Sequence, residues 1–243
     1  ATPGALLHVF GTSPQLMLAD CATNSVAKSG FIVLPHYTNA EEDVTSMYSY
    51  SDNNINALYW GGGDGIQNAA TEHNFYTAAN NTTVTGTVRM KIDSDGAVTK
   101  PATPAFLTCQ TTAQANLTGD GTFATVSFGS ELFDQGGNLS GSTFTAPVSG
   151  RYQFTAHLRP QGILSGHTTG FLYINTSNSA YQAWYGSPYA VSAADAELEM
   201  AGTMILDMDA ADTAYIQIYV AGSTKVIDMP YGGNVTFAGY LIA

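Results

Sequence analysis

Residues 142–154 read STFTAPVSGRYQF, a turn signal that runs directly into an alternating strand. From residue 152 onward, polar side chains alternate with Tyr152, Phe154, Ala156 and Leu158. A period of two is typical of a strand with one buried and one solvent-facing side. The stretch therefore predicts a half-buried strand in an all-β fold.

The C-terminal part of the chain repeats this pattern. Turn-forming residues separate the candidate strands, which are residues 122–128, 150–159, 170–175, 181–185, 197–207, 213–221 and 235–242. Seven strands at such spacing predict a sandwich or jelly roll. In residues 213–221 both sides carry substantial side chains, although a second sheet covers only one side. We therefore expect Tyr215 and Tyr219 at an interface with another subunit, with two solvent-exposed tyrosines as the alternative.

Two prolines mark the boundary between modules. Pro101 and Pro104 lie in an extended segment that cannot continue a helix or a central strand. We expect a strand-rich module at residues 1–100, a linker at 101–105 and a second module at 106–243. In the first module, clusters of Gly, Asn, Ser and Asp separate short apolar runs, which predict short strands at 6–10, 15–18, 31–34, 57–60 and 88–92. Asp95-Gly96 predicts a tight hairpin turn.

Composition excludes several classes of protein. The formal net charge is −12 with only seven Lys plus Arg, so nucleic-acid binding is not expected. No run approaches 18 consecutive apolar residues, so membrane insertion is not expected either. Charged residues make up 11% of the chain, against about 25% in ordinary domains, which is typical of an exposed or assembled protein. Cys21 and Cys109 are interpreted as buried thiols, with a disulfide as the alternative.

The motifs of common enzymes are absent from the sequence. The five histidines form no His-Glu-x-x-His pattern, and there is no Gly-x-Ser-x-Gly elbow. The stretch GGGDG at residues 61–65 lacks the Lys-Ser/Thr pair of a phosphate loop, so it predicts a turn or a close chain approach. We therefore expect a protein that is not an enzyme.

Three ordered motifs resemble the C1q and tumour-necrosis-factor-like jelly rolls, over about residues 106–243. They are Phe144 and Pro147 before Gly150-x-Tyr152-x-Phe154, the stretch LDMDAADTAYIQI at residues 206–218, and Phe237-x-Gly239-x-Leu241. The resemblance implies a ten-strand, two-sheet jelly roll that forms a homotrimer and binds protein or glycan partners without catalysis. The collagen-like Gly-X-Y stalk of animal members is missing.

The N-terminal module resembles the strand-rich units of phage and virus fibre proteins, over about residues 30–105. This resemblance is carried by RMKIDSDGAV at 89–98, NALYWGGG at 56–63 and NFY at 74–76. Together the two resemblances imply a structural protein of the virion surface, which is extracellular: a tail or head fibre or a capsid-decoration subunit. It would contact other virion proteins and a host cell-surface glycan or protein. The alternatives are a secreted C1q-like binding protein of a cell and, third, a glycan depolymerase spike with an acidic pair.

Two groups of residues are candidate sites. Tyr181, Trp184, Tyr185 and Tyr189 could stack on sugars, with a place in the core or a trimer interface as the alternative. Asp207, Asp209 and Asp212 are candidate calcium ligands, because carboxylate oxygens in loops bind Ca²⁺. The alternative is a hairpin loop at 209–212, where Asp favours the turn. No other cofactor is expected.

Overall fold

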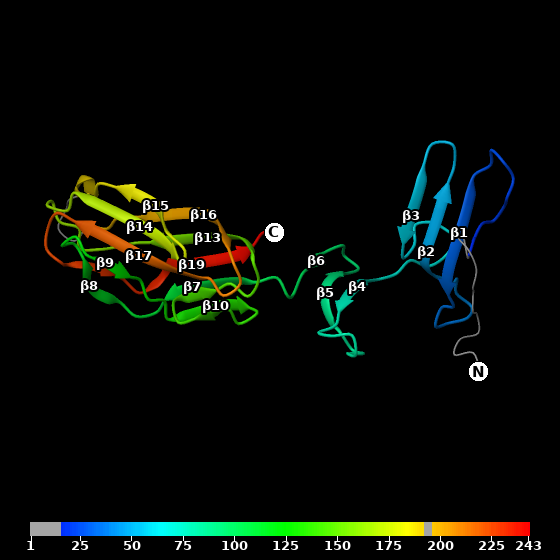
Figure 1. Ribbon diagram of the computed structural model, residues 1–243, viewed down its shortest axis with the longest axis horizontal. Coiled ribbons are helices and arrows are strands. Elements are labelled where there is room, and N and C mark those ends of the chain that lie inside the picture. Colours follow the sequence, from blue (N-terminus) through cyan, green and yellow to red (C-terminus); the bar gives the residue numbers. More distant parts are fainter. Residues whose placement is uncertain (1–15, 192–195) are drawn as a thin grey trace. The chain divides into compact units, whose positions relative to one another are not determined.

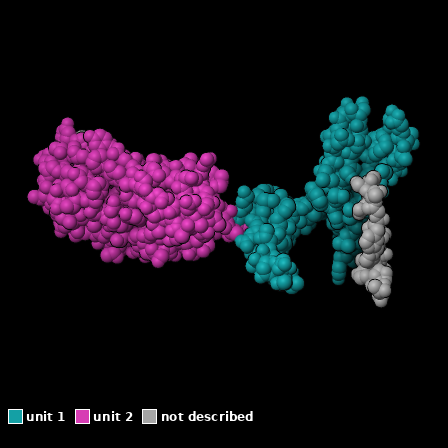
Figure 2. Space-filling view, viewed as in Figure 1, with its two compact units in different colours: residues 1–100 teal, residues 101–243 magenta. Residues whose placement is uncertain are grey.

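A computed structural model describes residues 16–191 and 196–243 (Figure 1). The chain divides into two compact units, residues 1–100 and residues 101–243, which Figure 2 distinguishes by colour. Both units consist of antiparallel strands, and the described residues contain a single helical turn, η1 (Pro188–Val191). The prediction of an all-β fold is confirmed.

Unit 2 is a jelly-roll sandwich of two sheets, to which a two-stranded ribbon is added. The five-stranded sheet has the order β10 (Ser130–Gln135), β7 (Ala105–Gln110), β19 (Gly232–Leu241), β13 (Gly150–Leu158), β16 (Met200–Met208). The six-stranded sheet has the order β11 (Leu139–Ser140), β12 (Thr143–Thr145), β17 (Thr213–Ala221), β14 (Thr169–Thr176), β15 (Ala180–Gly186), and β9 (Phe123–Thr125) pairs with β17. The ribbon joins β8 (Gln114–Thr118) to β18 (Ile227–Met229).

The stretch at residues 142–154 connects the two sheets. Its first strand, β12, belongs to the six-stranded sheet, and its second, β13, belongs to the five-stranded sheet. The ring of Phe144 on β12 lies 5.4 Å from that of Tyr152 and 5.7 Å from that of Phe154, both on β13. The alternation predicted for this strand is confirmed, because every second residue from Tyr152 to Leu158 is fully buried. The stretch therefore builds part of the core that it crosses.

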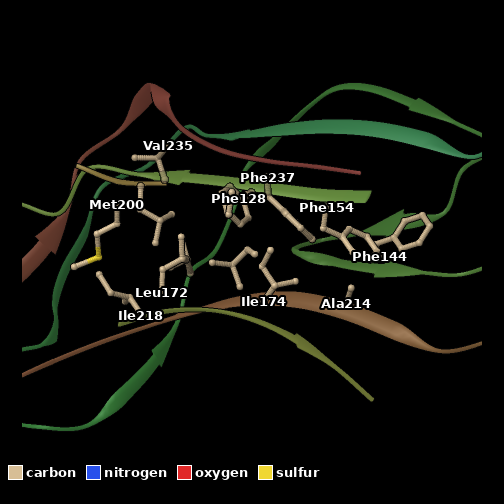
Figure 3. Close-up of a cluster of buried hydrophobic side chains, with 14 of the residues drawn as sticks. Phe128, Phe144, Phe154, Leu172, Ile174, Met200, Ala214, Ile218, Val235 and Phe237 are labelled. Atoms are coloured by element: carbon tan, nitrogen blue, oxygen red, sulfur yellow. The ribbon is translucent and has the colours of Figure 1, made fainter. Parts of the chain in front are cut away.

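The core between the sheets is aliphatic and aromatic (Figure 3). The closing motif packs there tightly through Phe237 and Gly239 of β19. A methyl group on Gly239 would lie 2.6 Å from the Phe154 ring and 2.7 Å from the Phe106 ring, closer than carbon atoms can approach. Glycine is therefore required at this position by packing.

Two strand predictions in unit 2 need correction. Of residues 122–128 only the short β9 is a strand, and the last backbone hydrogen bond to β17 comes from the Val126 N–H to the Ile216 carbonyl. The strand expected at 197–207 begins at Met200. Residues 209–212 do form a turn, but not a hairpin loop, because β16 and β17 lie in different sheets. Alternation reveals which side of a strand is buried but not which sheet the strand joins.

Unit 1 contains two small sheets. The first has the order β1 (Lys28–Leu34), β2 (Val44–Ser51), β3 (Asn56–Trp60), and the second β4 (His73–Thr77), β5 (Thr87–Ile92), β6 (Val98–Thr99). The strands expected at 31–34, 57–60 and 88–92 are present, whereas residues 16–18 form no strand. The strand expected at 6–10 lies outside the described residues, as does residue 15. The hairpin at Gly96 is confirmed: its N–H donates to the Asp93 carbonyl at 3.0 Å.

The glycine run at residues 61–65 forms the predicted turn. Gly61 and Gly62 have φ angles of 80° and 136°, which favour glycine, and a methyl group on Gly61 would collide with the His73 ring. The Asp64 carboxylate accepts hydrogen bonds from the N–H groups of Gln67 and Ile66, and these bonds lower the pKa of Asp64. The chain thus turns sharply between the two sheets of unit 1.

Neither cysteine forms a disulfide. Cys109 on β7 is buried, as predicted. Cys21 is partly exposed, so the prediction of a buried thiol is wrong there. It precedes β1, in a segment where Asp20 and Ser29 hydrogen-bond to each other.

Candidate binding surface of unit 2

The four aromatic residues predicted to bind sugars lie on different sides of the six-stranded sheet. Tyr181 and Trp184 on β15 pack against the core, whereas Tyr185 and Tyr189 are exposed. The cause is a β-bulge: Leu172 pairs with Trp184 and Tyr173 with Gln182, so one residue of β15 is left unpaired. A bulge shifts the alternation by one residue. Tyr181 therefore lies on the inner side together with Trp184, whereas unbroken alternation would place Tyr181 on the same side as Tyr185.

Tyr185 belongs to a row of four aromatic rings that crosses the outer face of this sheet. The cross-strand pairs are Tyr185 with Phe171, Phe171 with Tyr219, and Tyr219 with Phe123. Their ring centroids are 5.2, 5.4 and 4.8 Å apart in that order. Tyr185 and Phe123, at the two ends, are 64% and 53% exposed. We call these four residues the outer aromatic row.

The neighbouring row is polar and uncharged. It consists of Gln182, Tyr173, Gln217 and Thr125, in register across the same four strands. Gln217 accepts a hydrogen bond from the Asn175 amide at 3.1 Å. Apolar ring faces beside amide and hydroxyl groups match the alternating apolar and hydroxyl surface of a sugar ring. The surface can therefore stack on and hydrogen-bond to a neutral glycan.

Two members of the outer aromatic row, Phe123 and Phe171, were not predicted as site residues. The alternation of β14 contains the signal for Phe171, since Gly170, Leu172 and Ile174 face the core and leave Phe171 on the outer side. For Phe123 no such signal exists, because β9 is only three residues long.

Tyr215 and Tyr219, the residues predicted at a trimer interface, both lie half-buried on this outer face. Tyr215 pairs with Asn175, two rows from the outer aromatic row. Tyr219 is itself part of that row. The interface role of these tyrosines stays a prediction, and it competes with the ligand role predicted for Tyr185 because Tyr185 and Tyr219 share one surface.

The outer face of the five-stranded sheet has a different character. Its central row, which we call the flat row, consists of Leu107, Ala238, Thr155 and Thr203 on the four strands from β7 to β16. On the edge strand β10, the exposed Phe133 pairs with Leu107. The hydroxyl oxygens of the two threonines lie 2.9 Å apart, within hydrogen-bonding distance. The side chains of the flat row are small or aliphatic and carry no charge, so another chain could approach closely.

Charged groups border this face. His157 donates from one ring nitrogen to the Asn234 carbonyl at 2.6 Å, and its other nitrogen lies 2.6 Å from the Glu199 carboxylate. Arg159 forms an ion pair with Glu197 nearby. His157 lies on the outer side of β13, among the polar residues that alternate with the buried Ala156 and Leu158. Ionisable groups therefore lie beyond one side of the flat row and are absent from the row itself.

The three candidate calcium ligands do not converge. Asp207 lies on β16 opposite Arg151, while the Asp212 carboxylate accepts hydrogen bonds from the Ser177 hydroxyl at 2.6 Å and the Asp209 N–H at 2.8 Å. These bonds, the one from Ser177 first, lower the pKa of Asp212. Within residues 16–191 and 196–243, no three His, Cys, Asp or Glu side chains are grouped so as to hold a metal ion. Calcium binding stays a prediction from the sequence.

Comparison with known proteins identifies the family. The model of the C1q domain matches residues 105–242, more than half of the chain, and the chain belongs to this family. The globular domain of zebrafish complement 1qA is 17% identical, with a TM-score of 0.40, over 58% of this chain and 98% of that chain. Murine APRIL at pH 5.0 is 10% identical, with a TM-score of 0.41, over 58% and 99%. A search of curated proteins gives no match.

Unit 2 is thus a C1q/TNF-like jelly roll, as the sequence motifs predicted. Domains of this family are non-enzymatic binding modules, typically trimeric and extracellular. In the part of the chain that the structure describes, no helix has the length and apolarity needed to cross a membrane.

Proposed function

We propose that the protein is a non-enzymatic structural subunit of a virion surface, a fibre or capsid-decoration protein. It forms a homotrimer and presents unit 2 as a head that binds a host-surface glycan or protein receptor. The observation that carries the recognition role is the outer aromatic row, an uncharged stacking surface on a domain of a binding family. The fibre resemblance of residues 30–105 supports the virion role.

In this proposal the flat row forms the trimer contact and the outer aromatic row contacts the ligand. Small uncharged side chains such as Ala238 and Thr155 allow two sheets to approach closely. The exposed rings of Tyr185 and Phe123 are better suited to a sugar, because a ring that projects from a sheet presents its apolar face to a ligand. Assigning one role to each surface removes the competition between Tyr185 and Tyr219.

Binding to an array of neutral and sialylated glycans tests the recognition role. Tyr185→Ala removes a ring from the end of the row, and we expect binding about 2- to 12-fold weaker, since one stacking contact contributes roughly 0.5–1.5 kcal/mol. Tyr37→Ala is the matched control, because Tyr37 is fully exposed in unit 1. Equal losses in both variants, or no binding by the native protein to any glycan or host cell, would refute this role for the row.

Labelled antibody on purified virions tests the location. The proposal predicts that label is found on intact particles and that the protein co-purifies with them. The secreted C1q-like protein of a cell is the second candidate, which the family membership favours equally. It predicts a signal peptide in the full gene and no label on particles. Release of reducing sugar from host polysaccharide would instead support the depolymerase.

A further inference from the structure

Unit 1 has almost no hydrophobic core of its own. Among its described residues, 16–100, the buried positions are Gly30, Thr45, Gly61 and Gly62. Every buried hydrophobic side chain in the described parts of the chain lies in unit 2, between Phe106 and Phe237. A two- or three-stranded sheet without a covered apolar face is marginally stable at best in water. The strands of unit 1 therefore need a surface that covers them.

The first face to cover is a ladder of rings. Phe31 pairs with Tyr48 across β1 and β2, and Tyr48 pairs with Tyr59 across β2 and β3. The rings are nearly parallel, with centroids 4.9 and 4.7 Å apart. Stacking covers part of each ring, yet Tyr59 at the end of the ladder stays exposed.

The opposite face of the same sheet is also apolar and only partly covered, since Leu18 lies against Gly30 and leaves the large side chains exposed. Ile32, Met47 and Trp60 form one row across the three strands, and Leu58 lies in the next. Trp60 is 65% exposed. Since a strand alternates its side chains, the sheet is apolar on both faces, which is typical of a sheet enclosed on both sides.

The second sheet of unit 1 also has one apolar face that is not covered. Phe75 pairs with Met90, while Ile92 pairs with both His73 and Val98. Phe75 and Val98 are exposed, and Met90 and Ile92 only half-buried. The two sheets of unit 1 thus present three apolar faces that residues 16–100 leave largely exposed.

We propose that these faces are covered by unit 1 of other copies of the same chain, so that unit 1 folds as a self-associated bundle of sheets. The distribution of charge favours another copy of unit 1 as the partner of these faces. A chain with a net charge of −12 repels its copies, yet the rows centred on Tyr48 and Met47 contain no charged residue, so they can meet without burying like charges.

The short connection between unit 1 and the C1q domain also favours other copies of unit 1 as the partner. Unit 1 ends at Lys100 and the C1q domain begins at residue 105, so only four residues separate them. If unit 2 is trimeric, as the proposed function holds, three copies of unit 1 are kept at an effective concentration on the order of millimolar. The inference rests on that proposed trimer.

Two measurements on the full-length protein test this inference together. Hydrogen exchange, followed by mass spectrometry, reports the protection of unit 1, and the native mass reports the oligomeric state. We expect a trimer in which the amides of β2 and β5 exchange at least about a hundredfold more slowly than in an unstructured chain. Trp60→Ser should accelerate exchange in residues 28–60 at least about tenfold, while unit 2 keeps the protein trimeric. Tyr37→Ser is the control, since Tyr37 is fully exposed outside the strands, and it should change neither quantity.

Four outcomes would overturn the inference. A trimer whose unit 1 amides exchange as in an unstructured chain would refute self-association there while leaving the proposed trimeric head intact. Slow exchange in a monomeric protein would show that another segment of the same chain covers the faces. An unchanged exchange rate in Trp60→Ser would show that the face carrying Trp60 is not buried. A monomer with fast exchange would refute both this inference and the proposed trimer.

Discussion

An arginine at Ala238 tests which face of unit 2 forms the trimer. Ala238 lies half-buried at the centre of the flat row, between Leu107 and Thr155, and neither of these neighbours can pair with a guanidinium group. Burying an unpaired charge costs roughly 3 kcal/mol or more, so three copies cost about 9 kcal/mol per trimer. At 1.4 kcal/mol per factor of ten, the trimer dissociation constant should rise about a million-fold.

Gln217→Arg is the matched control. Gln217 is half-buried at the centre of the outer face of the six-stranded sheet, so it receives the same charge in a similar position on the opposite side of the sandwich. Sedimentation velocity over a range of concentrations measures both variants. We expect Ala238→Arg to dissociate and Gln217→Arg to stay trimeric. The reverse result would refute the flat row as the interface and would support the original prediction at Tyr215 and Tyr219.

Three further predictions concern unit 2 itself. Gly239→Ala should lower the free energy of unfolding by about 1–3 kcal/mol in urea, because its methyl group would collide with two buried rings. His167→Ala should cost about 2–4 kcal/mol, since the buried imidazole accepts from the Leu164 N–H and donates to the Thr224 carbonyl; a loss under about 0.5 kcal/mol would contradict this. The lowered pKa of Asp212 means that its carboxylate stabilises the fold above about pH 4 and loses this effect as the pH falls through its folded pKa. In Asp212→Asn, the free energy of unfolding should therefore depend less on pH. The measurement covers about pH 2 to 5, a range that spans the usual Asp pKa of about 3.9.

The regular strands of unit 2 could be predicted from the sequence because burial on one side produces alternation. The strand over residues 213–221 was predicted with its observed ends, and β13 to within one residue. Short or irregular strands such as β10 and β12 could not be predicted, since two to six residues contain too few alternations to stand out.

The candidate surface was predicted only in part, for a reason that is also physical. The sequence predicts Tyr185 as a site residue, but the bulge that places Tyr181 on the other side of β15 depends on pairing with β14. The outer aromatic row depends on register among four strands far apart in the sequence, which no local pattern encodes. The uncovered faces of unit 1 likewise became evident only once Phe31, Tyr48 and Tyr59 were seen to align.

The mass of the native full-length protein tests the central claim most directly. A structural subunit that self-associates through both units should give, in native mass spectrometry at micromolar concentration, the mass of three copies of the 25.5 kDa chain. A single chain at that concentration would contradict the trimeric head, the self-associated unit 1 and the virion role built on them.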